Sequence, residues 1–449
     1  MHVALLTILS PLSLLLLWIQ APSGARCELQ TVYEWKYLDF LWDSEEHKLA
    51  AVKAGEYNFS RVLPSDLAVA KDGRVFVSHI GYAGVPARLS TVTSRLGPNS
   101  GPLLAPYPNW NWHRNGDDAP GDSACSGITS VYGLAIDQCN RLWVLDTGIP
   151  EVQPHAGGVK GPAKKICQAQ LLAFDLTRDK LAKRIKIPNH IAQNDQGMSR
   201  LVKPIVETKG QQCDHTTVYM TDSVGHGLVI WNGIGLFRLE GEVYNPIDGA
   251  RNMSIGQHSL SIGGGVVDMS LSPNIFPYEP RYLFFRPLAS YDLYAANTRE
   301  LTRSVYGYRI KYFGARDILS SQSVGQAFSS DGTLFLGLSS EMAIACWNRY
   351  RELAKENIVI VAQDKQRLRY ASGVKVVPKT ITKTAEELWV LTNRFLQFQL
   401  GKMDFSDINF RIMKGAVKDL VEGTKCELPA QLKAALRRRK VNLAYKYPK

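Results

Sequence analysis

A short strand-like motif that occurs six times along the chain constrains the fold more than any other feature. Each copy combines a turn with an apolar run of strand length, as in Arg-Leu-Trp-Val-Leu-Asp at residues 141–146. The other five apolar runs align on Val75, Val218, Leu283, Leu334 and Leu388. The copies are 51 to 76 residues apart, and long repeats of strand-rich units are typical of propellers and arrays. Six units of roughly four short strands predict an all-β chain folded as a six-bladed β-propeller.

The two ends of the chain are predicted to lie outside this ring. Residues 1–25 contain an apolar run followed by small residues, which predicts a secretory signal peptide. Residues 26–428 form the predicted propeller domain, and 429–449 a basic C-terminal tail. Because a propeller must close, we expect the aromatic segment 31–42 to lend a strand to the last blade.

Composition places the protein among globular proteins. The 449 residues are 45% hydrophobic and 21% charged, which is typical of a folded chain. After the signal peptide no apolar run is long enough for a membrane span. The formal net charge of +12 leaves two interpretations open, namely an acidic extracellular matrix or glycan partner, or a gain in solubility alone. No stacking motif for nucleic acid accompanies the basic residues.

Seven cysteines fit an oxidising compartment. Cys27 borders the signal peptide and is expected to be the odd one, and the remaining six can pair in 15 ways. No Cys-x-x-Cys or Cys/His spacing indicates zinc, so no metal site is predicted. Asn58 and Asn252 begin Asn-x-Ser triplets and are candidate glycosylation sites.

Residues 94–127, rich in Pro and Gly, are interpreted as a long insertion between blades. Such a loop is either functional or a cover that Trp110 and Trp112 pack onto a blade.

The sequence contains no Gly-x-Ser-x-Gly, His-Glu-x-x-His or phosphate-loop motif, so catalytic residues stay unassigned and no cofactor is predicted. Propellers bind ligands where loops from several blades converge on the central opening. The polar residues just beyond the repeated strands are Ser78, Asp146, Asp222, Ser339 and Asn393. They are candidate ligand contacts, although Asp146 and Asp222 could equally cap turns.

Several motifs together resemble the insect yellow / major royal jelly protein family. They are Trp35–Phe40, Arg141–Gly148, Met269–Pro273, Arg286–Ser290, Ala345–Asn348 and Asn409–Met413. The resemblance runs from about residue 31 to residue 428 and implies a secreted six-bladed propeller. It also implies three disulfides, which are Cys125–Cys167, Cys139–Cys213 and Cys346–Cys426.

The resemblance implies a secreted yellow-like protein of cuticle pigmentation and melanisation, which binds catecholamine-derived melanin precursors or helps to convert them. One alternative is a non-enzymatic, salivary-type binder of biogenic amines. Another is an enzyme, either a dopachrome isomerase or a metal-dependent lactonase, although two carboxylates are few for calcium.

Asn393-Arg394-Phe395 is similar to an Asn-x-Phe motif of the amine-binding members. The predicted site therefore holds a small aromatic amine or catecholamine derivative. Its ammonium would pair with Asp146 or Asp222, its hydroxyl with Asn393 and its ring with Phe395.

Overall fold

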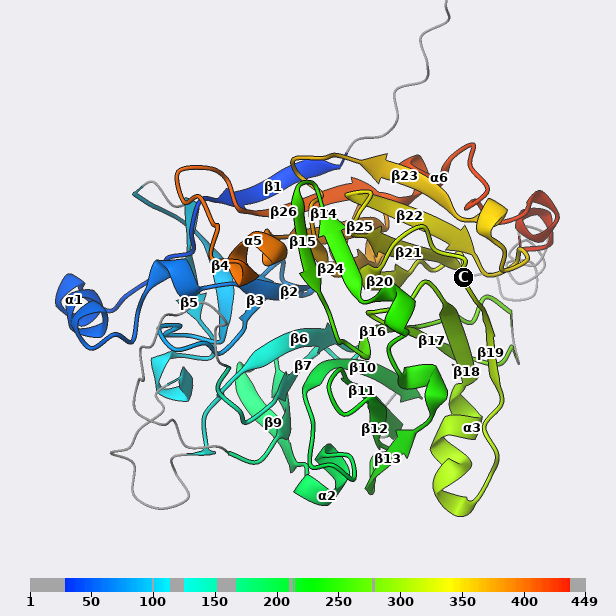
Figure 1. The fold of residues 1–449 in the computed structure, drawn as a ribbon, viewed down its shortest axis with the longest axis horizontal. Helices are drawn as coiled ribbons and strands as arrows, with labels where there is room; N and C mark the ends of the chain where they lie inside the picture. The colour runs from blue at the N-terminus through cyan, green and yellow to red at the C-terminus, as the bar shows by residue number, and fades with distance from the viewer. Residues whose placement is uncertain are drawn as a thin grey trace, which may run out of the picture.

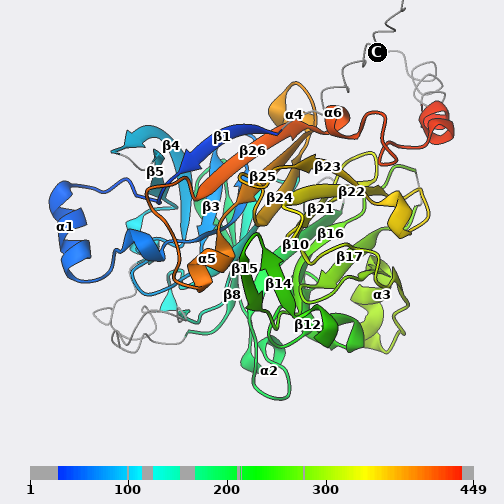
Figure 2. The ribbon, with the colours of Figure 1, turned by 45° about the horizontal axis from the view of Figure 1, so that its top comes forward.

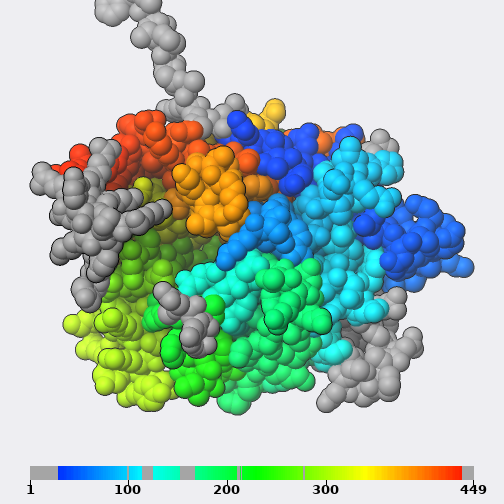
Figure 3. Space-filling view, turned by 180° about the vertical axis from the view of Figure 1, so that it is seen from behind, coloured from blue at the N-terminus to red at the C-terminus, as the bar shows by residue number. Residues whose placement is uncertain are grey.

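The computed structural model is a six-bladed β-propeller, as the sixfold motif predicts, with six four-stranded antiparallel sheets arranged around one axis (Figure 1). The structure describes residues 29–98, 101–113, 125–151, 167–209, 213, 215–276 and 279–436. The predicted signal peptide, Cys27 and the tail beyond residue 436 lie outside the described residues. Seen from behind, the colours run around the face in chain order (Figure 3).

The strands of each blade follow one another outwards from the axis. The inner strands are β2 (Pro64–Val69), β6 (Val131–Ile136), β10 (Leu201–Lys209), β16 (Val266–Leu271), β20 (Ser323–Phe328) and β24 (Ala371–Val377). The second strands are β3 (Val75–His79), β7 (Arg141–Asp146), β11 (His215–Asp222), β17 (Tyr282–Pro287), β21 (Thr333–Leu338) and β25 (Glu387–Thr392).

The other two strands of each blade lie further from the axis. The third strands are β4 (Leu89–Gly97), β8 (Gln170–Asp175), β12 (Gly227–Trp231), β18 (Leu293–Asn297), β22 (Ala343–Asn348) and β26 (Phe410–Ala416). The outermost strands are β5 (Gly101–Pro106), β9 (Lys180–Lys186), β13 (Leu236–Glu240), β19 (Tyr312–Ala315), β23 (Val359–Gln363) and β1 (Gln30–Trp35).

Burial explains why the second strands carry the repeated apolar motif. In β7 every residue after Arg141 is buried, and in β21 all residues are buried. A middle strand lies between two neighbours in its own sheet and between the faces of two adjacent blades, so both of its faces must be apolar. The outermost strand β9 faces solvent and contains three lysines and an arginine.

The ring closes where the sequence predicts. β1 pairs antiparallel with β26 and becomes the outermost strand of the sixth blade, from Gln30 opposite Lys414 to Trp35 opposite Phe410. Figure 2 shows the two strands side by side. The strand ends at Trp35, and Phe40 already pairs with Leu104 of the first blade. The predicted segment 31–42 therefore joins the last blade to the first.

In the described part of the chain, six labelled short helices and one additional hairpin lie between or after the strands, and residues 430–436 are also helical. The helices are α1 (Glu45–Lys53), α2 (Asn189–Ala192), α3 (Thr298–Arg303), α4 (Lys379–Thr382), α5 (Phe395–Gln399) and α6 (Val417–Val421). The hairpin consists of β14 (Asn252–Ile255) and β15 (His258–Ser261) and lies with α5 in front of the ring centre (Figure 1). In the described ranges no helix has the length and apolar character needed to cross a bilayer.

The three disulfides expected from the family resemblance are present. Cys125 is bonded to Cys167 and Cys139 to Cys213. Cys346 in β22 is bonded to Cys426, which fastens the segment after α6 to the fifth blade across 80 residues of chain. Closing so long a loop restricts the unfolded chain by roughly 4–5 kcal/mol in the chain-entropy model.

The interpretation of residues 94–127 as an insertion is wrong for its first part. β4 continues to Gly97, and β5 spans Gly101–Pro106 as the outermost strand of the first blade. Proline is tolerated there because an edge strand has N–H groups without a ladder partner. The covering role holds for the two tryptophans, since Trp110 stacks on Trp42 and Trp112 contacts Phe174 edge-on.

One buried arginine and two buried histidines form a cluster next to this cover. Arg88 is buried and donates to the carbonyl oxygens of Thr129 and His113. His113 Nδ1 accepts from the backbone N–H of Arg88, and His79 contacts Ser90. Burial, followed by the nearby guanidinium of Arg88, lowers the pKa of both histidines from 6.5 to about 3. Both rings are therefore neutral in the folded protein at pH 5.

We expect this cluster to make the fold sensitive to acid. The unfolded chain binds protons at His79 and His113 below about pH 6.5, whereas the folded chain does so only near pH 3. The free energy of unfolding is therefore at its full value above pH 6.5, and it falls as the pH is lowered towards 3. Between pH 7 and pH 5 each histidine should cost about 2 kcal/mol.

Urea unfolding at both pH values measures this loss. In His113→Gln the loss should be smaller by about 2 kcal/mol, while in the control His215→Gln, at an exposed position, it should be unchanged. An equal loss in all three proteins would contradict the prediction.

Candidate functional site

A cavity of about 340 Å³ lies on the propeller axis, lined by residues from all six blades. This volume is within the range of small-molecule pockets. Residues 260–264, at the end of the β14–β15 hairpin and just after it, form part of its wall, as do Phe395 and Gln399 of α5. The hairpin and α5 therefore border the cavity on the face shown in Figure 1.

An irregularity in every inner strand shapes the cavity. Each inner strand pairs with its second strand through its first residue and then shifts register by the third or fourth. A β-bulge re-aims side chains, and the second residue of every inner strand lines the cavity. These six residues are Ser65, Tyr132, Val202, Val267, Val324 and Ser372.

The third residues of the inner strands carry charge in three of the six blades. They are Asp66, Gly133, Lys203, Asp268, Gly325 and Gly373. The glycines make room: a Cβ on Gly133 would come within 2.7 Å of the Lys203 side chain, and one on Gly373 within 2.9 Å of Asp66 Oδ1. Asp66, Lys203 and Asp268 line the cavity.

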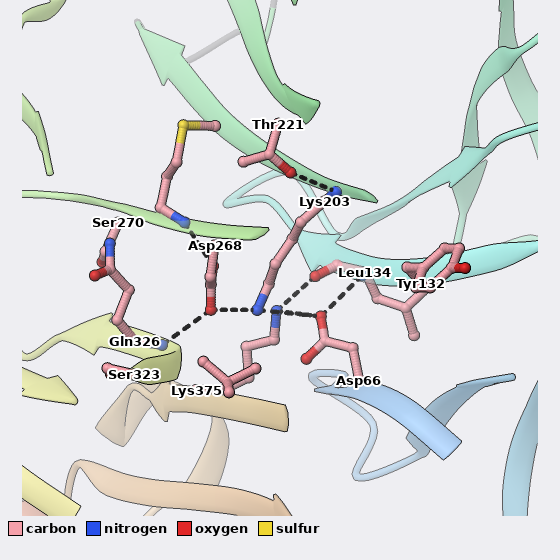
Figure 4. Close-up of polar contacts among 12 residues, drawn as sticks. Asp66, Tyr132, Leu134, Lys203, Thr221, Asp268, Ser270, Ser323, Gln326 and Lys375 are labelled. Carbon is pink, nitrogen blue, oxygen red and sulfur yellow. Dashed lines mark hydrogen bonds and ion pairs between the residues drawn. The ribbon is translucent and has the colours of Figure 1, made fainter. Parts of the chain in front are cut away.

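These charges form one network with Lys375, which Figure 4 shows between the strands of four blades. Lys203 Nζ lies 2.6 Å from Asp268 and 3.5 Å from Asp66. Lys375 Nζ lies 2.8 Å from Asp66 and donates to the carbonyl of Leu134 at 2.6 Å. Two carboxylates and two ammonium groups thus compensate one another at the bottom of the cavity.

The surroundings act differently on the two lysines. Burial favours the neutral form of Lys203, but the adjacent Asp268 and Asp66 outweigh it and raise the pKa of Lys203. Burial dominates at Lys375 and lowers its pKa to about 8, against the attraction of Asp66. Lys203 is the cation that lies within ion-pair distance of both carboxylates.

Two of the four predicted ligand residues line the cavity. Asn393 is buried, and its Nδ2 donates to the Pro64 carbonyl and the Ser372 hydroxyl. A carbonyl can only accept, so this contact fixes the amide orientation. Asn393 Oδ1 then has no hydrogen-bond partner among the residues that the structure describes. Phe395 is half-buried and stacks on Tyr370, with ring centroids 4.8 Å apart.

The structure does not bring Asp146 and Asp222 to the cavity wall. Asp146 is buried and accepts from the backbone N–H groups of Thr129, Ser130 and Gly148. Asp222 is also buried; it accepts from the backbone N–H groups of Arg200 and Gly225 and pairs with Arg238. These are the turn-capping contacts that the sequence left as an alternative.

A one-residue offset separates the two pairs. Asp146 and Asp222 are the last residues of β7 and β11, where they pair with Val131 and Leu201 of the inner strands. Asn393 lies one residue beyond the end of β25 at Thr392. Because successive side chains in an extended chain point to opposite faces, this offset directs Asn393 elsewhere.

A charged pair on the cavity wall was not predicted from the sequence. Glu151 and Arg200 both line the cavity, with their carboxylate and guanidinium groups 3.1 Å apart. The Glu151 side chain is 10% exposed and that of Arg200 is 41% exposed. Tyr82, Tyr132 and Tyr370 add aromatic surface. No local motif marked Glu151 or Arg200 in the sequence: Glu151 follows the motif strand β7, and Arg200 precedes the inner strand β10.

Asp146 and Asp222 hold the backbone at or near the two residues of this pair. Asp222 holds the backbone of Arg200 itself, and Asp146 holds Gly148, three residues before Glu151. Glu151 is further fixed by a backbone hydrogen bond to Gly81. Within the described ranges, no group of three or more His, Cys, Asp or Glu side chains is arranged to hold a metal ion.

Comparison with known proteins gives the family. The family model described as Major royal jelly protein matches residues 129–426. The chain belongs to the major royal jelly protein family. Among its relatives, Major royal jelly protein 9 of Apis mellifera is 36% identical, over 89% of this chain and 90% of that protein. Major royal jelly protein 1 of the same organism is 34% identical, over 89% and 90%.

One of the solved structures to which this major royal jelly protein family member is similar is only distantly alike. The α-L-arabinofuranosidase Arb93A of Fusarium graminearum has a TM-score of 0.47 and 8% identity, and the match covers 88% of this chain and 100% of that one. A likeness this distant does not bear on function.

The charge network leads to a stability prediction. In Lys203→Met, Asp268 and Asp66 lose their shared buried cation, which should cost about 3–5 kcal/mol in urea unfolding. The double variant Lys203→Met/Asp268→Asn should recover part of this loss. The control is Lys433→Met, whose partner Glu427 is 32% exposed; it should cost less than about 1 kcal/mol. Equal losses in Lys203→Met and the control would show that the network is not coupled as described.

Proposed function

We propose that this major royal jelly protein family member is a secreted binder of small aromatic amines, and that its ligands are catecholamine-derived precursors of cuticle melanin. The observation that carries the proposal is the axial cavity, which combines aromatic rings with an unsatisfied buried acceptor and a carboxylate. Its volume of about 340 Å³ suits a ligand of one or two rings.

The cavity offers one group for each part of such a ligand. The aromatic ring would lie against Phe395, which already stacks on Tyr370. A catechol hydroxyl would donate to Asn393 Oδ1, a buried acceptor whose unmet hydrogen bond otherwise carries a desolvation cost. The ammonium would approach Glu151. In this arrangement Asp146 and Asp222 act from behind, by holding the backbone near Glu151 and at Arg200.

Secretion is part of the same proposal. The predicted signal peptide would take the chain to a compartment in which its three disulfides persist. Asn58 and Asn252, the predicted glycosylation sites, are both exposed. The net charge of +12 would favour retention in an acidic extracellular matrix.

Calorimetry with dopamine and serotonin tests the proposed binding. The wild-type protein should bind at least one of them, and Phe395→Ala should weaken the affinity roughly tenfold because the ring contact is lost. Phe405→Ala is the matched control, since Phe405 contacts Phe59 edge-on and does not line the cavity. If the wild-type protein binds neither amine, or if both variants weaken binding equally, the proposal fails.

A second candidate function is conversion of dopachrome. Asp66 favours it, because this residue brings a carboxylate to the lining of the cavity, and isomerisation needs a base in the site. Asp66→Asn should then reduce dopachrome turnover at least a hundredfold, with or without chelator. Asp268→Asn is the matched control, since both of its oxygens have partners. Absence of turnover by the wild-type protein would exclude this function.

A further inference from the structure

The wall of the cavity carries two opposite charges at one place. Glu151 Oε2 and Arg200 Nη2 are 3.1 Å apart. They come from different blades, because Glu151 follows β7 of the second blade and Arg200 precedes β10 of the third. Both belong to the lining of the 340 Å³ cavity. A ligand that enters therefore meets a neutral pair and not an isolated carboxylate.

The backbone of both residues is fixed. Glu151 donates its backbone N–H to Gly81 at 3.1 Å, and the adjoining Tyr82 pairs with it in a parallel bridge. Arg200 donates its backbone N–H to Asp222 at 2.8 Å and accepts from Ser223 at 3.0 Å. The two side chains are thus presented by anchored segments, which is what a recognition site requires.

A neutral pair discriminates between ligands by their charge. A simple amine that approaches Glu151 must compete with Arg200 and places its own positive charge beside the guanidinium. A zwitterion avoids this conflict, because its ammonium can face Glu151 while its carboxylate faces Arg200. Guanidinium groups bind carboxylates well, with paired N–H donors in one plane.

We propose that the Glu151–Arg200 pair selects aromatic α-amino acids over the corresponding decarboxylated amines. This inference rests on the proposed function, since it uses the same cavity and the same aromatic wall. The ligand would complete an alternating square of charges with Glu151 and Arg200, and its ring would extend towards Tyr82, Tyr370 and Phe395. The ligand class is defined by a carboxylate and an ammonium on one carbon next to an arylmethyl group.

The cavity floor does not offer an equivalent cation. Lys203 also lines the cavity, but its ammonium is 2.6 Å from Asp268 and 3.5 Å from Asp66, with its side chain only 4% exposed. Arg200 is 41% exposed, and its guanidinium has five N–H donors. A ligand carboxylate therefore reaches Arg200 at much lower cost than it reaches Lys203.

The test compares matched ligand pairs by calorimetry on the full-length protein: L-DOPA with dopamine, and L-tryptophan with tryptamine. The wild-type protein should bind each amino acid about tenfold to a hundredfold more tightly than its amine. In Arg200→Met this preference should disappear, and amine binding should be unchanged or tighter because the repelling charge is gone. In Glu151→Gln both ligand classes should bind more weakly.

Arg251→Met is the control, because Arg251 has the same exposure (40%), pairs with Asp248 and does not line the cavity. It should keep the wild-type preference. If Arg200→Met weakens amines and amino acids equally, Arg200 has only a structural role and the inference is overturned.

Failure of the inference is distinguishable from failure of the proposed function. If amines bind in a Phe395-dependent manner and the amino acids bind no better, the selectivity is overturned and the proposed function stands. If no aromatic ligand of either class binds, both are overturned.

Discussion

The pairing of β1 with β26 is the contact on which the rest of the structure depends. Each blade buries the faces of its middle strands against its two neighbours, so the apolar motif is covered only when the ring is complete. Because the closing strand comes from the opposite end of the chain, the ring is held by hydrogen bonds between residues 30–35 and 410–414. Non-local pairing of this kind slows folding because loop-closure entropy must be lost first. The Cys346–Cys426 disulfide restricts the unfolded C-terminal part of the chain.

Closure has a consequence at the axis. Six inner strands converge there, and the bulge in each one turns its second residue into the cavity. The third residues of three inner strands, Asp66, Lys203 and Asp268, place charges inside the protein. Burial of a charge is costly unless the charge is paired. Lys203 and Lys375 compensate Asp66 and Asp268. The cavity is therefore polar at its floor and aromatic on its wall, with Glu151 and Arg200 as its charged pair.

The motifs predicted the fold more completely than the site. The six apolar runs gave the blade number because burial on both faces leaves a local pattern, and the family resemblance gave the three disulfides. The wrong interpretation of residues 94–127 arose because Pro102 and Pro106 oppose a central strand, whereas they occupy an edge strand. Asn393 and Phe395 were found through a motif, while Glu151, Arg200 and the tyrosines on the wall have no local signature.

The sequence by itself determined the repeat, the ring and the family, because these depend on the order of apolar runs and on short motifs. Only the tertiary structure decided which polar residues reach the axis. Asp146 and Asp222 are the last residues of their strands, and their carboxylates accept hydrogen bonds from backbone N–H groups. Asn393 lies one residue past its strand and lines the cavity. Side chains alternate between faces along a strand, so a shift of one residue, invisible in a pattern of six imperfect repeats, changes the environment of a side chain completely.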